Sequence, residues 1–220
     1  MGFDIHSVYG QSFSYKRYIP SKILIQRLKY QATNSVLLTF DDGPDPRNTP
    51  KVLDKLDEYE AKAIFFVVGR RFERAPDLLN EILRRGHLIG NHTYAHDNKK
   101  EPSMIAYYRD IQKCQDKIKE LTGVAPNLFR PAKGVVSLAT VLLPKAMGLK
   151  HVRWSLSGDD WRCKNQDEAS VMAKELAVKT QSRDIILLHD DNPYINIILD
   201  VLLKALQEIG YNMSCGFKFL

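Results

Sequence analysis

Residues 39–44 read Thr-Phe-Asp-Asp-Gly-Pro and follow the short apolar run Val36-Leu37-Leu38. The apolar run has the composition of a buried strand, and a Gly-Pro pair after two acids is typical of a sharp turn. A packed core does not tolerate two unpaired carboxylates. The strand that ends in Asp41 and Asp42 is therefore expected either to feed an active site or only to cap the next helix.

Strand and helix patterns alternate along the chain from residue 36. Near-continuous apolar strands separated by amphipathic helices predict a parallel sheet that is buried on both faces. An open doubly wound sheet and a closed barrel both fit this order, but no Gly-x-Gly-x-x-Gly follows the first strand, so the fingerprint of a dinucleotide-binding sheet is missing. Strands are expected at 36–40, 63–68, 87–91, 129–131, 150–155, 184–189 and 211–214, and helices at 49–59, 76–85, 103–121, 137–147 (interrupted by Pro144), 167–180 and 196–209.

The composition indicates one large domain. The chain has 220 residues, of which 44% are hydrophobic, and this supports a sizeable core. The net charge of +6 fits an anionic partner or a membrane surface without requiring either. No Cys/His finger or basic-region heptad indicates binding to nucleic acid.

We expect residues 1–34 to form an N-terminal arm and residues 35–220 to form the main domain. Within the arm, residues 20–30 have the pattern of a short basic amphipathic helix that either covers the bottom of the domain, which we favour, or lies on an anionic membrane. The three cysteines, Cys114, Cys163 and Cys215, form no CxxC pair, which favours a reducing compartment.

The location of the protein is inferred from missing signals. There is no signal-peptide pattern and no apolar run long enough to cross a membrane. A cytoplasmic location, or the cytoplasmic face of a membrane, is therefore expected. A secreted or periplasmic location stays open for a trimmed sequence.

Polar side chains gather just after the predicted strands, where a barrel of parallel strands places its chemistry. His92 and His96 are four residues apart, so on a helical turn both imidazoles share one face and can hold one ion. A carboxylate from the first strand would complete a set of three ligands with an open position, as catalytic metal sites have. Nitrogen and oxygen ligands suit zinc, and also cobalt, manganese, iron or nickel.

Five ordered motifs together resemble the polysaccharide deacetylases of carbohydrate esterase family 4, which act on chitin, peptidoglycan and nodulation factors. The resemblance covers about residues 35–214 and implies an irregular (β/α) barrel of about seven parallel strands. It also implies a divalent metal, zinc before cobalt, manganese, iron or nickel, and an N-acetylated sugar as substrate. The motifs are residues 39–44, His92–His96, Arg130–Gly134, Asp159–Trp161 and Leu187–His189.

The resemblance assigns a role to each matching residue. Asp42, His92 and His96 would hold the metal, and Asp41, paired with Arg130, would be the general base. His189, oriented by Asp160, would be the general acid that protonates the leaving amine. The substrate-binding residues would be Trp161 and Leu187, which would line a pocket for the acetyl methyl group, together with Pro131 and Lys133.

Lys133 departs from the pattern of the family, which usually has an aromatic residue at this position. We weigh two interpretations: a solvated lysine, and a lysine that reaches an anionic group of the substrate. In the block around Asp159, Ser157 has no assigned role.

The sequence thus favours an enzyme that removes an N-acetyl group, or a close relative such as formyl, from the amino sugar of a polysaccharide, an oligosaccharide or a lipid-linked glycan. Two alternatives remain: an enzyme for another amide or an O-acetyl ester, and a barrel that binds sugar without hydrolysing it.

Overall fold

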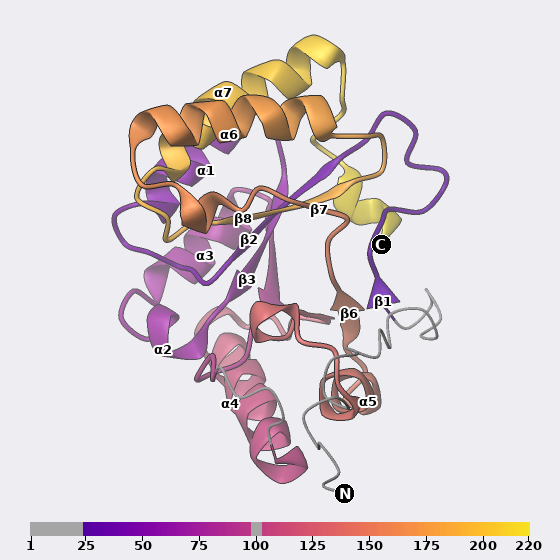
Figure 1. The fold of residues 1–220 in the computed structure, drawn as a ribbon. Coiled ribbons are helices and arrows are strands. Elements are labelled where there is room, and N and C mark those ends of the chain that lie inside the picture. The colour runs from indigo at the N-terminus through magenta and orange to yellow at the C-terminus, as the bar shows by residue number, and fades with distance from the viewer. Residues whose placement is uncertain (1–23, 98–102) are drawn as a thin grey trace, which may run out of the picture.

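The computed structural model describes residues 24–97 and 103–220, and within them eight strands form a single parallel sheet (Figure 1). The strand order is β1-β6-β5-β4-β3-β2-β8-β7. The strands are β1 (Leu24–Ile25), β2 (Leu37–Asp41), β3 (Ala63–Val67), β4 (Leu88–Asn91), β5 (Leu128–Phe129), β6 (Lys150–Val152), β7 (Leu156–Ser157) and β8 (Ile185–His189).

The helices surround the curled sheet, so that the molecule is an irregular half-barrel of the (β/α) type, as expected from the sequence (Figure 1). Neighbouring outer helices contact one another in the order α6, α7, α1, α3, α4 and α5. None of the described helices is long and apolar enough to cross a membrane. The helices are α1 (Thr49–Glu58), α2 (Gly69–Phe72), α3 (Asp77–Arg84), α4 (Met104–Thr122), α5 (Leu138–Ala146), α6 (Gln166–Lys179) and α7 (Ile195–Ile209), with short 3₁₀ turns η3 (Ala132–Gly134), η4 (Asp160–Arg162) and η5 (Gly216–Phe219).

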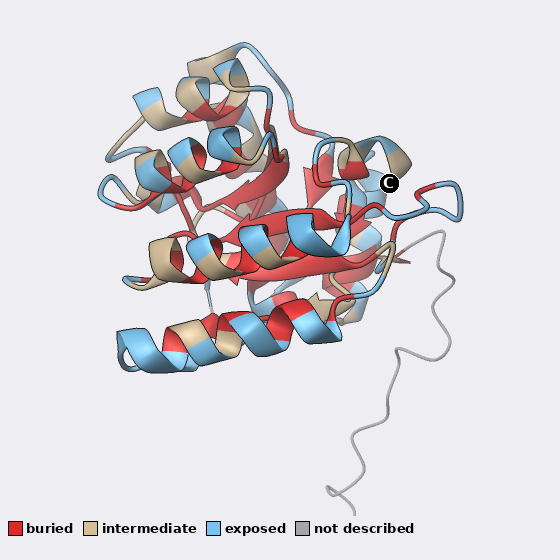
Figure 2. Cartoon of the chain, turned by 90° about the horizontal axis from the view of Figure 1, so that it is seen from above, coloured by how far each residue is buried: buried red, intermediate tan, exposed pale blue. Residues whose placement is uncertain are grey.

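Alternation along the strands separates two cores. In β2, Leu38 and Phe40 pack in the larger cluster together with the outer helices, whereas Leu37 packs in a second cluster with Ile64, Phe66 and Leu220. Because side chains of a strand alternate between faces, Thr39 and Asp41 lie on the same face as Leu37. The interior face of the barrel therefore changes from apolar to acidic toward the end of β2. Figure 2 shows the central strands largely buried, and β2 and β3 are buried along their whole length, while the helices expose their outward sides.

The prediction of a basic helix at 20–30 is wrong where the structure describes it. Leu24 and Ile25 form β1, which pairs with His151 and Val152 of β6. The basic residues have partners in the barrel, since Arg27 forms an ion pair with Asp184 at 3.0 Å and Lys29 donates a hydrogen bond to the Leu220 carbonyl at 2.7 Å. Buried Leu24 and Leu28 thus pack with the sheet instead of forming one face of a helix. Residues 20–23 lie outside the described part of the chain, and the boundary at residues 34 and 35 stays a prediction.

Three further expectations needed correction. Residues 150–155 do not form one strand, because Arg153 donates its amide to Ile25 on one side while Ser155 donates its amide to Ile185 on the other. Residues 211–214 form only an isolated bridge at Asn212. Pro144 does not interrupt α5, which ends two residues later at Ala146, so few helical hydrogen bonds remain for the proline to disrupt.

Candidate metal and catalytic site

Asp41 ends β2 and is held by a buried ion pair. Its Oδ1 accepts a hydrogen bond from Nη1 of Arg130 at 2.6 Å, and both side chains are almost fully inaccessible to solvent. The remaining guanidinium donors of Arg130 bind the carbonyls of Val152 and Arg153 and the hydroxyl of Thr39. All these partners belong to the barrel wall, so the Arg130 guanidinium presents a fixed positive charge to one side of the Asp41 carboxylate.

Asp42 leaves the strand in a left-handed conformation, with φ of 72°, which turns its side chain away from the strand direction. The next residue, Gly43, leaves no room for a side chain, because a Cβ there would lie 2.1 Å from Oδ1 of Asp190. Asp190 is itself buried and accepts a hydrogen bond from Thr49 at the start of α1. The Asp-Asp-Gly-Pro turn is therefore packed against both α1 and the segment after β8.

His92 and His96 follow β4 in a loop, and the expectation of a helical turn is wrong. Thr93 and His96 have φ values of 69° and 49°, which a right-handed helix does not contain. The loop is held by Asp110 of α4, whose carboxylate accepts hydrogen bonds from the amides of Tyr94 and Ala95. The His96 amide donates to Oγ1 of Thr93. The two imidazoles meet through this loop and not through helical spacing, with ring centroids 5.0 Å apart.

The three side chains Asp42, His92 and His96 converge on one small space. Oδ1 of Asp42 lies 2.9 Å from Nε2 of His96 and 3.4 Å from Nε2 of His92. Ligand atoms around a tetrahedral zinc ion are about 3.3 Å apart. Buried Oδ1 of Asp42 has no well-formed hydrogen bond within the described residues, so its lone pairs stay available. The set fits a divalent cation.

Two further observations suit a cation at this place. The Nδ1 atom of His92 is 2.7 Å from the Arg130 carbonyl, which fixes Nδ1 as the protonated nitrogen and leaves Nε2 as the electron-pair donor. Burial alone would raise the pKa of the Asp42 carboxyl, but the positive charge of protonated His92 and His96 outweighs burial and lowers this pKa well below its usual range; a cation held by the same three residues would act in the same direction. Asp42 is thus charged, as a metal ligand must be.

His189 ends β8 and is paired with a fully buried carboxylate. Its Nδ1 lies 2.8 Å from Oδ1 of Asp160, and its amide donates to Oδ2 of Asp160 at 2.9 Å. Burial opposes protonation of the imidazole, but the hydrogen bond and charge of Asp160 prevail and raise the pKa of His189 to about 9. The imidazole is therefore protonated at neutral pH, and its Nε2 carries a proton that can be donated.

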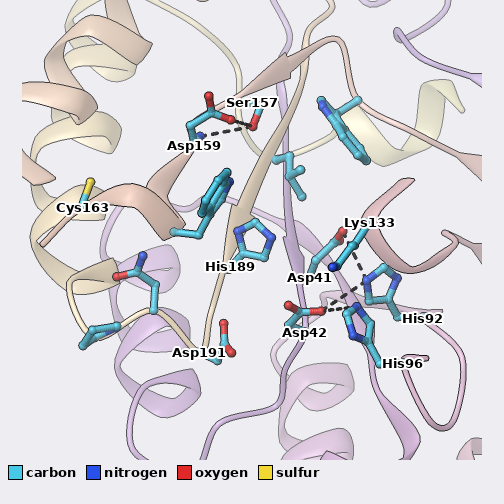
Figure 3. Close-up of a pocket in the computed structure, with 15 residues that line it drawn as sticks. Asp41, Asp42, His92, His96, Lys133, Ser157, Asp159, Cys163, His189 and Asp191 are labelled. Carbon is cyan, nitrogen blue, oxygen red and sulfur yellow. Dashed lines mark hydrogen bonds and ion pairs between the residues drawn. The ribbon is translucent and has the colours of Figure 1, made fainter. Parts of the chain in front are cut away.

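Both groups of residues border one pocket of about 790 Å³ (Figure 3). Of the residues predicted from sequence to contact the substrate, Trp161, Leu187 and Lys133 line this pocket, whereas buried Pro131 does not. Arg130 and Asp160 support the lining residues from behind. The pocket is lined by Asp41, Asp42, His92, His96, Lys133, Trp154, Ser157, Asp159, Trp161, Cys163, Leu187, His189, Asp191, Asn192 and Pro193.

Sequence reasoning missed several residues that hold the site. Asp110 orders the histidine loop, and Asn192 donates a hydrogen bond from its side-chain Nδ2 to the Asp160 carbonyl at 2.7 Å. Trp154 also lines the pocket, and it packs against the interior cluster as well. Asp110 lies in the middle of a helix and carries no local signal of its role. Asn192, before a proline and after two acids, could have been suspected as a turn residue.

Non-glycine residues with a left-handed backbone conformation are concentrated around the pocket. Five residues that border it or its histidine loop have φ between 49° and 72°, although none is glycine. Such conformations are uncommon for residues with a Cβ and cost energy, so the surrounding contacts must enforce them. These residues are Asp42, Thr93, His96, Lys133 and Asp159.

A curled parallel sheet with two histidines and a carboxylate grouped at the ends of its strands, facing a protonated His–Asp pair, has the arrangement of a hydrolase. Comparison with known proteins agrees. The sequence profile of the family "Polysaccharide deacetylase" matches residues 29–152. A peptidoglycan-N-acetylglucosamine deacetylase of Bacillus cereus is 36% identical over 191 residues, which are 84% of this chain and 84% of that protein. The chain belongs to the polysaccharide deacetylase family.

Two further comparisons extend this result. The peptidoglycan-N-acetylglucosamine deacetylase PgdA of Listeria monocytogenes is 33% identical over 197 residues; these are 89% of this chain but only 41% of PgdA, so the chain spans less than half of that relative. The crystal structure of the Bc1960 peptidoglycan N-acetylglucosamine deacetylase, in complex with an N-hydroxybenzamide, superposes with a TM-score of 0.80 at 30% identity, covering 87% of this chain and 90% of that one.

Proposed function

We propose that this protein is a metal-dependent deacetylase that hydrolyses the N-acetyl amide of an amino sugar within a glycan. The observation that supports this most directly is the position of three groups on one pocket: the Asp42, His92 and His96 cluster, the carboxylate of Asp41, and the protonated imidazole of His189. Hydrolysis of an amide needs an activated water, a stabilised carbonyl oxygen and a proton for the departing nitrogen.

The cluster and Asp41 would serve the first half of the reaction. Asp42, His92 and His96 would hold a divalent cation, zinc before cobalt, manganese, iron or nickel. When bound, the cation supplies Lewis-acid polarisation of the carbonyl and lowers the pKa of water toward about 7. Asp41 then accepts the proton of the attacking water. The ion pair with Arg130 holds the Asp41 carboxylate in place for this transfer, with an Oδ1 to Nη1 distance of 2.6 Å.

His189 would serve the second half. An amine leaves an acyl carbon poorly unless it is protonated, so the reaction needs an acid on the far side of the amide from the base. The imidazole of His189 carries that proton at neutral pH because its pKa is raised to about 9. After proton transfer the C–N bond breaks, and the products are acetate and a free amino sugar. Leu187 and Trp161 would enclose the acetyl methyl group.

The relatives suggest which substrates to test first. The Bacillus cereus and Listeria monocytogenes relatives are named for N-acetylglucosamine in peptidoglycan. N-acetylglucosamine oligomers, peptidoglycan fragments and lipid-linked amino sugars are therefore the first set. Contact with an anionic membrane, and the cytoplasmic location expected from sequence, stay predictions.

The test combines metal analysis with product detection. The protein would be loaded with zinc and its metal content measured per chain, and acetate release from each substrate would be followed by mass spectrometry with Asp41→Asn as the control. Acetate together with free amine, lost in the control, supports the proposal. A bound cation without acetate release from polymeric, lipid-linked and small substrates would support a barrel that only binds sugar. Acetate without a free amine would indicate an O-acetyl esterase.

A further inference from the structure

The charged side chains that line the pocket are unevenly balanced. Four carboxylates line it, Asp41, Asp42, Asp159 and Asp191, and the cationic side chains among the described lining residues are Lys133 and His189, of which His189 is paired with Asp160. Two of the acids are neutralised by cationic partners outside the pocket lining: Arg130 pairs with Asp41, and Arg71 pairs with Asp191 at 2.6 Å. Lys133, by contrast, has no hydrogen-bond or ion-pair partner within residues 24–97 and 103–220. Its ammonium group is a free donor beside the cation site.

The backbone around Lys133 is held in one conformation. Lys133 lies in η3 with φ of 54° and ψ of 15°, a left-handed conformation. The following Gly134 is fixed from two sides: its carbonyl accepts a hydrogen bond from buried Arg153, and a Cβ at this position would lie 2.3 Å from the ring of Trp154. The left-handed turn therefore persists without a substrate and sets the direction of the Lys133 side chain. Figure 3 shows this side chain on the Asp41 and His92 side of the pocket, away from Asp159.

We infer that Lys133 selects amino sugars that carry a carboxylate next to the acetamido group; this inference rests on the deacetylase function proposed above. The acetyl group must lie at Asp42, His92 and His96 for hydrolysis, and Lys133 lines the same pocket on the Asp41 and His92 side (Figure 3). We therefore place the group that Lys133 binds on the sugar ring that carries the acetyl group. On a 2-acetamido sugar the neighbouring ring positions are C1, which carries the glycosidic bond in an oligomer, and C3, so O3 is the neighbouring oxygen that is free to carry a substituent. A single ammonium group balances the charge of one carboxylate.

The charge pattern also fixes the orientation of such a substrate. On the opposite side of the pocket the cationic groups already have carboxylate partners, since Arg162 lies 4.0 Å from Asp159 and His189 is paired with Asp160. A substrate carboxylate there would compete with these acids. The same carboxylate beside Lys133 would be attracted. A substrate with a carboxylate at O3 is thus directed to the orientation in which its acetamido group meets the cluster of Asp42 and the histidines. A neutral substrate has no such preference.

The experiment compares two substrates of equal size and different charge. The first is an N-acetylglucosamine oligomer in which the reacting sugar bears a carboxylate-ended ether at O3, and the second is its methyl amide. The ratio of kcat/KM values for acid over amide is measured with the zinc-loaded protein, Lys133→Met, Lys133→Arg and the control Lys145→Met, which alters an exposed lysine outside the pocket lining. Both Lys133 variants keep a Cβ, so neither removes the cost of the left-handed conformation at residue 133.

The expected ratio is about ten for the wild-type protein, equivalent to about 1.4 kcal/mol. It should persist in Lys133→Arg and Lys145→Met, fall to within about twofold of one in Lys133→Met, and shrink as salt is raised, because salt screens exposed charges. A wild-type ratio near one, or an unchanged ratio in Lys133→Met, overturns the inference.

A binding measurement separates this inference from the proposed function. Calorimetric titration with the two deacetylated products, acid and amide, measures recognition of the carboxylate without turnover. If neither substrate releases acetate, the proposed function fails. Whether or not acetate is released, equal affinity for the acid and amide products overturns the selection by Lys133. A higher affinity for the acid product in the wild-type protein, absent in Lys133→Met, supports it.

Discussion

Asp41 and His189 are register partners on the neighbouring parallel strands β2 and β8. Their backbones are therefore separated by one inter-strand spacing, about 4.8 Å, and their side chains lie on the same interior face. Both residues are the last of their strands and both line the pocket. The relative position of the proposed base and the proposed acid is thus set by the hydrogen-bonded ladder of the sheet and not by a loop.

Asp41 and Asp42 should have different functions, which substitutions of each residue can distinguish. Asp42→Ala removes a cation ligand and should reduce bound zinc to a small fraction of one ion per chain. Asp41→Asn leaves the three-residue cluster intact, so zinc should remain, while kcat falls by about 10²- to 10⁴-fold because the proton acceptor is lost. Metal content by mass spectrometry and acetate release are the two readouts. Equal loss of zinc in both variants would show that the division between the two residues is wrong.

Turnover should depend on the protonated form of His189. With its pKa raised to about 9, activity should decline as the pH rises through that value. Asp160→Asn removes the charge that opposes burial, so the pKa of His189 should fall to 6.5 or below. At pH 8 the protonated fraction then drops by about 30-fold, and kcat/KM should drop with it. A pH profile from 5 to 10 tests this, and an alkaline limb that is the same in both proteins would contradict the role of Asp160.

The same imidazole should make stability depend on pH. Its folded pKa of about 9 lies above the ordinary 6.5 of an unfolded chain, so protonation favours the folded state. The contribution, up to roughly 3 kcal/mol, is complete below pH 6.5 and is lost as the pH rises through 9. Urea unfolding at pH 6 and pH 10, in chelator, should show a larger decrease for the wild-type protein than for His189→Gln. Parallel decreases would contradict this assignment.

Arg130 should matter for stability as much as for activity. Arg130→Met would leave the Asp41 carboxylate buried without a counter-charge, which should cost about 3–5 kcal/mol in the free energy of unfolding. Adding Asp41→Asn removes the unpaired charge, so the double variant should recover part of this loss. Urea unfolding of the wild type, both single variants and the double variant forms a complete cycle. Strictly additive losses would mean that the two side chains do not stabilise each other.

Gly43→Ala should disturb the site through Asp190. The added methyl group would lie 2.1 Å from the Asp190 carboxylate, so the turn or the segment after β8 has to shift. We expect a loss of about 1–3 kcal/mol in stability, together with weaker zinc binding because Asp42 moves. The double variant Gly43→Ala/Asp190→Ala should regain much of the lost stability and of the lost zinc affinity. As the control, Gly148→Ala meets no atom within 4 Å and only places alanine at a positive φ of 74°, so it should keep its zinc.

Much of the barrel could be predicted from sequence because its central strands are short apolar runs bounded by turns. β2, β3 and β8 were placed within a residue or two of their ends. The edge strand β1 could not be predicted from sequence, because it has only two residues and the basic side chains next to it produce the pattern of an amphipathic helix. Their partners, Asp184 and the Leu220 carbonyl, lie far away in the sequence and carry no local signal.

The site was predictable to the extent that parallel strands bring their carboxyl ends together. Asp41, Asp42, His92, His96 and His189 follow three such strands, and the structure places them on one pocket. The conformation of the histidine loop was not predictable, since four-residue spacing fits a helix and the loop instead depends on Asp110 of α4. The supporting roles of Asp190 and Asn192 likewise depend on tertiary contacts that no spacing shows.

The left-handed residues around the pocket have a consequence for the lifetime of the protein. Each of these conformations costs of order 1 kcal/mol or more, and they are concentrated where the cation would bind. Any ligand that fits this part of the chain adds its binding free energy to the folded state. The segments at Asp42 and Thr93 should then open first when the cation is scarce, so the supply of cation would govern how long each molecule survives proteolysis as well as how fast it works.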